Sequence, residues 1–295
     1  MRHLVTLNDL TATEVARIFA ITEDISEALK AKYLRGLREP LLPGRTLALL
    51  FEKQSLRTRV SFEAGMTHLG GNSIMMGDDV GFGKRESIAD FARVLGEMVD
   101  AVVLRTKNHA TVEEFAKYSG CAVINGLTDE SHPCQALGDL YTMREHFGTL
   151  KGLKLAWIGD GNNVARSLVR ACGHTGVAFS ICGPPGYEFD KAFLADVRQR
   201  YPSLNLEITQ DPREAVRGAS AVYTDVWASM GQEAERAKRL KDFAPYQVNG
   251  ELMKAAPPTA VFMHCLPARR GEEVTDAVID SPQSVVIPQA ANRMH

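Results

Sequence analysis

Short apolar runs alternate with segments of helical spacing along nearly the whole chain, and this alternation limits the fold more than any other feature. The runs of strand length lie at residues 46–51, 73–76, 101–104, 122–124, 154–158, 178–182, 206–208, 221–224, 260–263 and 285–287. Apolar residues at a period of about 3.6 predict helices between most of them, including a long one from Pro133 to Phe147. Because strands that alternate with helices pair in parallel under helical cover, the sequence predicts an α/β fold with doubly wound parallel sheets.

Two domains are expected, because 295 residues exceed the usual size of one domain and correspond to two of roughly 150 residues each. The alternation restarts after Gly148 and Gly152. We therefore predict a first domain over residues 1–147 and a second over residues 148–295. Polar clusters follow strands in both halves, and open parallel sheets bind ligands beyond the carboxyl ends of their strands. The predicted active site lies in the cleft between the domains.

Charge and cysteine usage restrict the class of partner and the compartment. Lysine and arginine number 34 against 36 acidic residues, so no overall field favours nucleic acid or an anionic membrane. Five scattered cysteines without a Cys-x-x-Cys pair argue against a disulfide framework and a zinc site. The N-terminus has no signal-peptide pattern, and no apolar run approaches membrane-spanning length. We expect a cytoplasmic protein that binds small molecules, not nucleic acid or membrane, and holds no metal.

The stretch FEKQSLRTR, residues 51–59, predicts an anion site between a strand and a helix. Ser55 and Thr58 offer hydroxyls, Arg57 and Arg59 offer forked guanidinium donors, and the helix start exposes unpaired backbone N–H groups. Phosphate suits such a set best. The alternative is that two arginines in a helical first turn are solvated surface residues.

A second set of hydrogen-bond donors follows the predicted strands at residues 101–104 and 122–124. Arg105 comes after a strand and can fork onto a carbonyl or phosphoryl oxygen, while His132 and Gln135 are spaced to point the same way from a helix start. Three donors around one oxygen would stabilise a developing oxyanion. His132 could instead be a helix-capping residue.

The turn GDGNN, residues 159–163, begins like a dinucleotide fingerprint. Val164 occupies the position of the third glycine, and the next strand ends without the acidic residue that would hold a ribose, so the fingerprint is incomplete. Asn162 and Asn163 are therefore expected either to bind a small polar ligand or to cap the following helix.

Two residues after later strands complete the candidate site. Asp225 could bind an ammonium group, and Cys265 could line the pocket, although an isolated cysteine is often a buried apolar residue. Neither a Ser/His/Asp or Cys/His set nor a carboxylate cluster supports a covalent or metal mechanism.

Several motifs in fixed order resemble those of one family across nearly the whole chain. They read FEKQSLRTRVSFE, GKRES, HPCQAL, GDGNN, DVWASMG, HCLPARRGEEV and ANR. The sequence resembles the ornithine carbamoyltransferases of the aspartate/ornithine carbamoyltransferase superfamily. The resemblance implies transfer of the carbamoyl group of carbamoyl phosphate to the side-chain amine of L-ornithine, giving L-citrulline and phosphate, as in arginine biosynthesis. It also implies no cofactor and a homotrimer, or a multiple of trimers, with sites between subunits.

The resemblance also implies residue roles, taken position by position. The residues that would bind carbamoyl phosphate are Ser55, Leu56, Arg57, Thr58, Arg105, His132, Gln135, Cys265, Leu266 and Arg293. The residues that would bind ornithine are Asn163, Asp225, Ser229 and Met230. The residues that would be catalytic are Arg105, His132, Gln135, Asp225 and Cys265.

The chain departs from the family pattern at a few positions. Leu56 replaces a frequent threonine, which removes a hydroxyl but keeps the backbone N–H, and Ala291 replaces a glutamate. Asn72 occupies a loop position that reaches a neighbouring subunit in relatives, and relatives continue past the position of His295 as a helix. These changes bear more on packing than on chemistry.

Rival acceptors are putrescine, aspartate and an N-acylated ornithine. Aspartate is disfavoured as the acceptor, because this chain has the motifs HPCQ and HCLP. The aspartate carbamoyltransferases have motifs that resemble HPTQ and HPLP at these positions. A relative that binds an amino acid without catalysis would show a damaged phosphate turn, whereas Arg57, Thr58 and Arg105 are intact.

Overall fold

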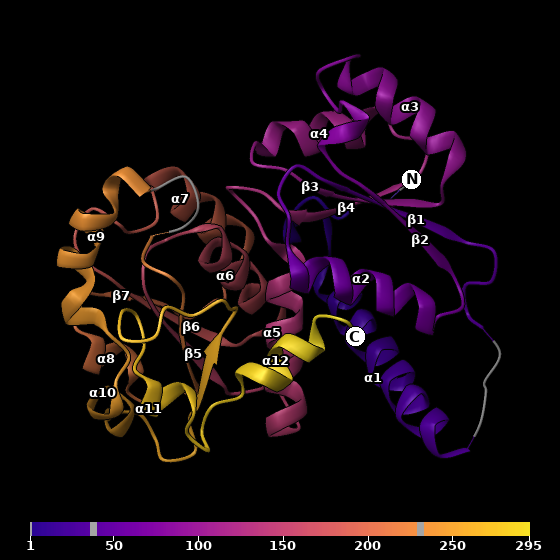
Figure 1. Cartoon of the computed structure of the whole chain (residues 1–295). Coiled ribbons are helices and arrows are strands. Elements are labelled where there is room, and N and C mark those ends of the chain that lie inside the picture. Colours follow the sequence, from indigo (N-terminus) through magenta and orange to yellow (C-terminus); the bar gives the residue numbers. More distant parts are fainter. Residues whose placement is uncertain (1, 36–39, 229–232) are drawn as a thin grey trace. The chain divides into compact units, whose positions relative to one another are not determined.

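The computed structural model describes residues 2–35, 40–228 and 233–295 (Figure 1). The chain divides into two compact units, the first over residues 1–137 with 293–295 and the second over residues 138–292. The division falls inside α5 (Pro133–Phe147). The predicted domain boundary at residues 147/148 lies at the end of the same helix and stays a prediction.

The first unit is built on a four-stranded parallel sheet in the order β2-β1-β3-β4. Its strands are β1 (Thr46–Phe51), β2 (Asn72–Met76), β3 (Ala101–Arg105) and β4 (Ala122–Leu127). Its helices besides the start of α5 are α1 (Ala12–Arg35), α2 (Leu56–His68), α3 (Ile88–Met98) and α4 (His109–Tyr118), with short 3₁₀ turns at Leu7–Asp9 and Asp78–Val80.

Both faces of this sheet are covered, α3 and α4 lying on one side and α1 and α2 on the other (Figure 1). Alternate residues of β1 face opposite sides, so Leu50 packs in the cluster that contains Phe115 of α4, and Leu49 in the cluster that contains Phe62 of α2. Full burial of each large apolar side chain contributes about 1.5–3 kcal/mol. This two-sided burial explains why the strands read as continuous apolar runs.

The second unit contains a five-stranded parallel sheet in the order β7-β6-β5-β8-β9. Its strands are β5 (Lys154–Ile158), β6 (Ala178–Cys182), β7 (Leu206–Thr209), β8 (Ala221–Thr224) and β9 (Val261–His264). Its helices are α6 (Asn163–Thr175), α7 (Lys191–Arg200), α8 (Pro212–Val216), α9 (Arg236–Phe243), α10 (Gly250–Ala255), α11 (Asp276–Ile279) and α12 (Val286–Asn292), with 3₁₀ turns at Glu233–Glu235 and Ala244–Tyr246. A core of Ile158, Val222 and Phe262 from the sheet packs with Phe243 and Leu252 from helices.

The strand orders confirm the predicted doubly wound fold and mark where ligands should bind. In each sheet the chain reverses its direction of winding once, between β1 and β3 in the first unit and between β5 and β8 in the second. Ligands of open α/β sheets lie at the carboxyl ends of the strands beside such a reversal. The predicted anion turn follows β1 and Arg105 ends β3, and the GDGNN turn and Asp225 follow β5 and β8. His132 and Gln135 come after β4, and Cys265 comes after β9.

The prediction of a strand at Val285–Ile287 is wrong. Only a single bridge joins Ser284 to Phe262, and α12 begins at Val286. Pro288 has no N–H to give to a sheet, but it fits the first turn of a helix, where that N–H would have no partner. The β-branched run therefore opens a helix.

Smaller differences concern element ends. β4 continues past the predicted end at Ile124 to Leu127, so Asn125 is a buried strand residue whose side chain donates to the carbonyl of Val5 at 2.9 Å. β9 is shifted by one residue, so His264 lies inside the strand. Asn72, expected in a loop, is the first residue of β2. Within the described ranges, no helix is long and apolar enough to cross a membrane.

Candidate active site

The turn after β1 is closed by its own side chains. Ser55 is the N-cap of α2, and its Oγ accepts the backbone N–H of Thr58 at 3.3 Å and donates to the Thr58 hydroxyl at 3.1 Å. Leu56 and Arg57 are the first helical residues, whose N–H groups have no partner within a helix. Leu56 is 75% exposed, and because its side chain is apolar, only its backbone N–H can donate to an anion at the turn. The predicted anion turn therefore forms at a helix N-terminus.

Arg105 ends β3 beside this turn. It lies opposite Phe51 in the sheet, and its Nη1 donates to the Thr58 hydroxyl at 3.3 Å. The residue is only 7% exposed, and its buried Nε has no hydrogen-bond partner among the described residues. An unsatisfied buried donor is costly, so this arrangement favours a bound acceptor such as a phosphoryl or carbonyl oxygen.

Arg293 joins the two donors that begin α5. Its Nη1 donates to Oε1 of Gln135 at 2.6 Å and lies 3.3 Å from Nε2 of His132. Because a guanidinium only donates, Nε2 of His132 accepts, and the neutral ring carries its proton on Nδ1. Nε and Nη2 of Arg293 are buried without a partner in the described part of the chain. His132 and Gln135 thus lie together as predicted, with Arg293 beside them.

We call Arg57, Arg105 and Arg293, with Thr58, His132 and Gln135, the guanidinium cluster. Burial, reinforced by the charges of Arg293 and Arg57, lowers the pKa of Arg105 to about 10. Burial also lowers the pKa of His132 well below 6.5, and the charges of Arg293 and Arg105 add to this effect. Like charges held close to buried Arg105 repel one another until an anion binds. The cluster is therefore suited to a multiply charged anion and contains a neutral imidazole, that of His132.

Glu52 is a supporting residue that the sequence reasoning missed. Its backbone N–H donates to the carbonyl of Arg105 at 2.9 Å. Its carboxylate accepts from the hydroxyl of Thr106 and from the N–H of Lys107, the latter at 3.2 Å. Glu52 thereby ties the anion turn to the strand end that carries Arg105. A carboxylate directly after a buried strand is the sequence signal that could have pointed to it.

In the second unit, Asp225 follows β8 and is held by neighbours on both oxygens. Oδ2 accepts from the side-chain amide of Asn162 at 3.0 Å, and Oδ1 accepts from the thiol of Cys265 at 3.2 Å. Asn162 also accepts the N–H groups of Val164 and Ala165 as the N-cap of α6. Asn162 therefore caps the helix and also orients Asp225. The sequence predicted either a helix cap or a contact with a ligand. We call Asn162, Asp225 and Cys265 the carboxylate cluster.

The glycines of GDGNN serve packing. A Cβ on Gly161 would meet the backbone nitrogen of Phe189 at 2.9 Å, and a Cβ on Gly159 would lie 3.2 Å from Nε1 of Trp157. These close contacts account for glycine without a bound pyrophosphate.

Asp225, His264 and Cys265 bring three ligand-type atoms within 4.8 Å of one another, which the sequence did not predict. Their hydrogen bonds already use these atoms. Nδ1 of His264 accepts the N–H of Leu266 at 2.9 Å, and Nε2 lies 3.1 Å from Oε1 of buried Glu273. Burial raises the pKa of the Cys265 thiol well above its ordinary value, and the charge of Asp225 adds to the effect. The thiol is therefore protonated near neutral pH and acts as a donor to Asp225.

Arg239 is a second supporting residue that the sequence reasoning missed, and no local pattern points to it. From α9 its Nη1 donates to Oδ2 of Asp160 at 2.8 Å and to the carbonyl of Trp227 at 3.0 Å. Burial raises the pKa of Asp160 to about 6 against the opposing effect of Arg239. Arg239 thus joins the GDGNN turn to the segment after Asp225. It stabilises the two segments that carry Asn162 and Asp225 of the carboxylate cluster.

The other predicted residues are placed as follows. Ser229 and Met230 lie outside the described residues. Asn163 is the first residue of α6. Leu266 has a left-handed backbone, with φ of 57°, before a cis bond to Pro267. The assignment of Asn163, Cys265 and Leu266 to particular substrates stays a prediction.

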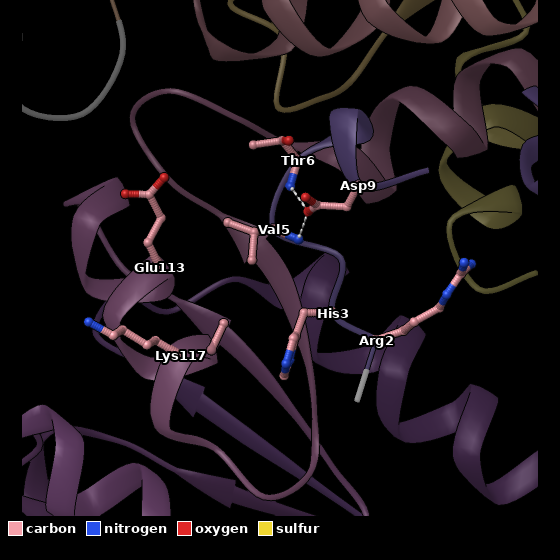
Figure 2. Close-up of a pocket in the computed structure, with 8 residues that line it drawn as sticks. Arg2, His3, Val5, Thr6, Asp9, Glu113 and Lys117 are labelled. Atoms are coloured by element: carbon pink, nitrogen blue, oxygen red, sulfur yellow. Dashed lines mark hydrogen bonds between the residues drawn. The ribbon is translucent and has the colours of Figure 1, made fainter. Parts of the chain in front are cut away.

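A pocket of about 600 Å³ lies elsewhere in the first unit (Figure 2). Figure 2 shows its wall of Arg2, His3, Val5, Thr6 and Asp9 from the N-terminal segment with Glu113 and Lys117 from α4. No predicted site residue lines it.

Comparisons with known proteins cover both units. The carbamoyl-P binding domain of aspartate/ornithine carbamoyltransferase matches residues 2–145, and the Asp/Orn binding domain matches residues 151–295. The ornithine carbamoyltransferase of Carboxydothermus hydrogenoformans is 50% identical over 100% of this chain and 94% of that protein. The anabolic ornithine carbamoyltransferase of Pyrococcus furiosus is 49% identical, over 100% of this chain and 93% of that protein. A solved structure of ornithine carbamoyltransferase from Pyrococcus furiosus has a TM-score of 0.93 at 49% identity, covering 100% of this chain and 94% of that one.

Proposed function

This chain belongs to the aspartate/ornithine carbamoyltransferase family, and we propose that it transfers the carbamoyl group of carbamoyl phosphate to the side-chain amine of L-ornithine. The products are L-citrulline and phosphate. The observation that carries this proposal is the guanidinium cluster, in which buried N–H groups of Arg105 and Arg293 have no partner among the described residues and so suit a phosphate dianion joined to a carbonyl.

Carbamoyl phosphate would bind with its phosphate at the turn of Ser55, Leu56, Arg57 and Thr58. Arg105, His132 and Gln135 would face the carbamoyl oxygen, with Arg293 completing the set. Donors aimed at this oxygen gain strength as it becomes an oxyanion, which lowers the barrier more than it strengthens ground-state binding. The C–N bond forms as the amine attacks, and the C–O bond to phosphate then breaks with loss of a proton from nitrogen.

Ornithine would bind at the carboxylate cluster. Hydrogen bonds from Asn162 and Cys265 orient the carboxylate of Asp225, and a carboxylate held in this way suits the α-ammonium group. Asn163 would contact the amino acid, while Ser229 and Met230 would close over it and exclude water. Cys265 and Leu266 would also border carbamoyl phosphate, so both clusters would act on one reaction.

Assembly and compartment are part of the proposal. Leu56, Val60 and Ile74 are large apolar residues, each at least half exposed on the first unit, which supports a homotrimer or a multiple of trimers. All five cysteines are free thiols, which supports a reducing cytoplasm. Its place would be arginine biosynthesis, in line with a relative named as anabolic.

A side-by-side acceptor assay tests the proposal. Citrulline and phosphate are measured with L-ornithine, putrescine, N-acetylornithine and aspartate under identical conditions. Ornithine should be the preferred acceptor by a wide margin, since the other three lack either the α-carboxylate, the free α-ammonium or the side-chain amine. Equal turnover of putrescine would refute the amino-acid clamp, and ornithine binding without turnover would indicate a non-catalytic relative.

A further inference from the structure

His109 is a buried imidazole outside the guanidinium cluster. It is the first residue of α4, it follows Arg105 by one short loop, and only 6% of it is exposed. A buried polar ring costs stability unless it is hydrogen-bonded, and an apolar side chain would fill such a place at lower cost. The presence of histidine therefore calls for a role that depends on its hydrogen bond.

Its hydrogen bond reaches the turn that precedes His132. Nδ1 of His109 lies 2.8 Å from Oγ1 of Thr128. The same oxygen accepts the N–H of Ser131 at 3.2 Å, and the N–H of Thr128 donates to the carbonyl of Ser131 at 2.9 Å. Thr128 and Ser131 thus close a tight turn, and the next residue is His132. The imidazole fastens this turn to the start of α4.

A second link runs in the same direction. The N–H of Asp129 donates to the carbonyl of Lys107 at 2.9 Å, which joins the turn to the loop after Arg105. Buried Asn125 points its side-chain amide toward Oγ1 of Thr128 at 3.5 Å. On the other side of the ring, Nε2 of His109 lies 4.0 Å from a carboxylate oxygen of Glu113, which lines the pocket in Figure 2. The ring is therefore held by its hydrogen bond to Thr128, with the Glu113 carboxylate nearby on the opposite side, and this bond ties the turn to the start of α4.

We propose that His109 is a positioning residue for carbamoyl transfer, which acts through Thr128 to hold His132 in its working orientation. The inference rests on the proposed function. Misplacement of a reacting group by about 1 Å can reduce a rate a hundredfold, so a buried side chain that fixes this turn has a measurable effect on turnover. His109 itself does not touch the substrate.

The test compares His109→Leu, His109→Asn and Val112→Ala. Asparagine can replace the Nδ1 interaction, leucine cannot, and Val112 is a fully buried residue one turn further along α4. His109→Leu should lower kcat roughly tenfold to a hundredfold, with an unchanged KM for ornithine. His109→Asn should recover most of the loss. Val112→Ala should lower the Tm but keep the wild-type kcat. For all variants, the rates are normalised to the concentration of folded protein.

A double-mutant cycle tests the route through Thr128. Thr128→Val should reproduce the kcat loss of His109→Leu, and the double variant should lose little more than either alone, because the two changes break one connection. An additive loss, or wild-type kcat in His109→Leu, would overturn the inference. The imidazole ¹⁵N signals of His132, recorded by NMR, should shift in His109→Leu and not in Val112→Ala. A wild-type protein that makes no citrulline would count against the proposed function, while the NMR comparison would still decide the role of His109.

Discussion

Replacement of Arg293 by alanine should damage catalysis in two separable ways. Arg293 donates to Gln135 at 2.6 Å and lies 3.3 Å from Nε2 of His132, and its charge helps to keep the pKa of His132 low. Arg293→Ala removes the donor and the charge together. It leaves both units' sheets untouched, because the residue lies outside every strand.

The size of the effect follows from these contacts. A hydrogen bond that involves a charged group contributes about 1.5–3 kcal/mol, and the lost attraction to a bound dianion adds to it. A total of roughly 2–4 kcal/mol corresponds to a loss of about thirtyfold to a thousandfold in kcat/KM for carbamoyl phosphate. Gln135 also loses its hydrogen bond from Arg293, which helps to orient its amide, so part of the loss should fall on kcat.

The second consequence concerns protonation. Burial is the main reason for the low pKa of His132, and the charge of Arg293 comes next. In Arg293→Ala the pKa of His132 should rise, although burial keeps it below 6.5. An NMR titration of the imidazole should therefore show a higher midpoint than in wild type, and the acid limb of the rate profile should move to higher pH.

Arg93→Ala is the matched control, because Arg93 is an exposed arginine of α3 that contacts Asp90 on its own helix and the ring of Tyr118 in α4, and neither residue belongs to the guanidinium cluster. This control should keep both kcat/KM and the His132 midpoint. The reasoning would be refuted if Arg293→Ala retained the wild-type kcat/KM, or if the midpoint of His132 did not move while the fold, judged by circular dichroism and Tm, was intact.

Four further outcomes are expected. Arg57→Ala should weaken carbamoyl phosphate binding in isothermal titration by roughly 2–4 kcal/mol, with only partial rescue by lysine; unchanged affinity would remove the turn from the site. Asp225→Asn should lose turnover of ornithine yet keep carbamoyl phosphate affinity, and equal losses of both would contradict the assignment. Cys265→Ser should retain more activity than Cys265→Ala, because a hydroxyl still donates to Asp225, and the wild-type thiol should react slowly with iodoacetamide near neutral pH because its pKa is raised. The free energy of unfolding should fall as pH drops below 6.5, where the unfolded chain protonates His132 and the folded chain does not, and a flat profile across that range would contradict the buried neutral ring.

Strands and donor residues could be predicted where a local pattern carries the information. The run at Thr46–Phe51 is apolar on both faces and leads to Ser55, a residue with strong N-cap preference, so strand, turn and helix start follow from adjacent residues. Val285–Ile287 has the same β-branched appearance, yet only the position of Pro288 in a first helical turn reveals a helix.

The supporting contacts could not be predicted, because they join residues far apart in the chain. Arg239 meets Asp160 across 79 positions, and Glu52 reaches Lys107 across 55. The spacing of residues in the sequence identifies neighbours along one helix or strand. These two long-range pairs form only when the sheet brings separate loops to one edge. The dual role of Asn162 was missed for the same reason, since its cap is local and its bond to Asp225 is not.

The contact between Arg293 and Gln135 spans 158 positions of the chain, which has a consequence during translation. Chains emerge from the ribosome in sequence order, and early domains fold while later ones are still being made. The strands that carry the anion turn and Arg105 are complete long before Arg293 is added. A nascent first unit would thus hold a folded sheet with an unfinished anion site, and tight carbamoyl phosphate binding would arise only after residue 293 has been synthesised.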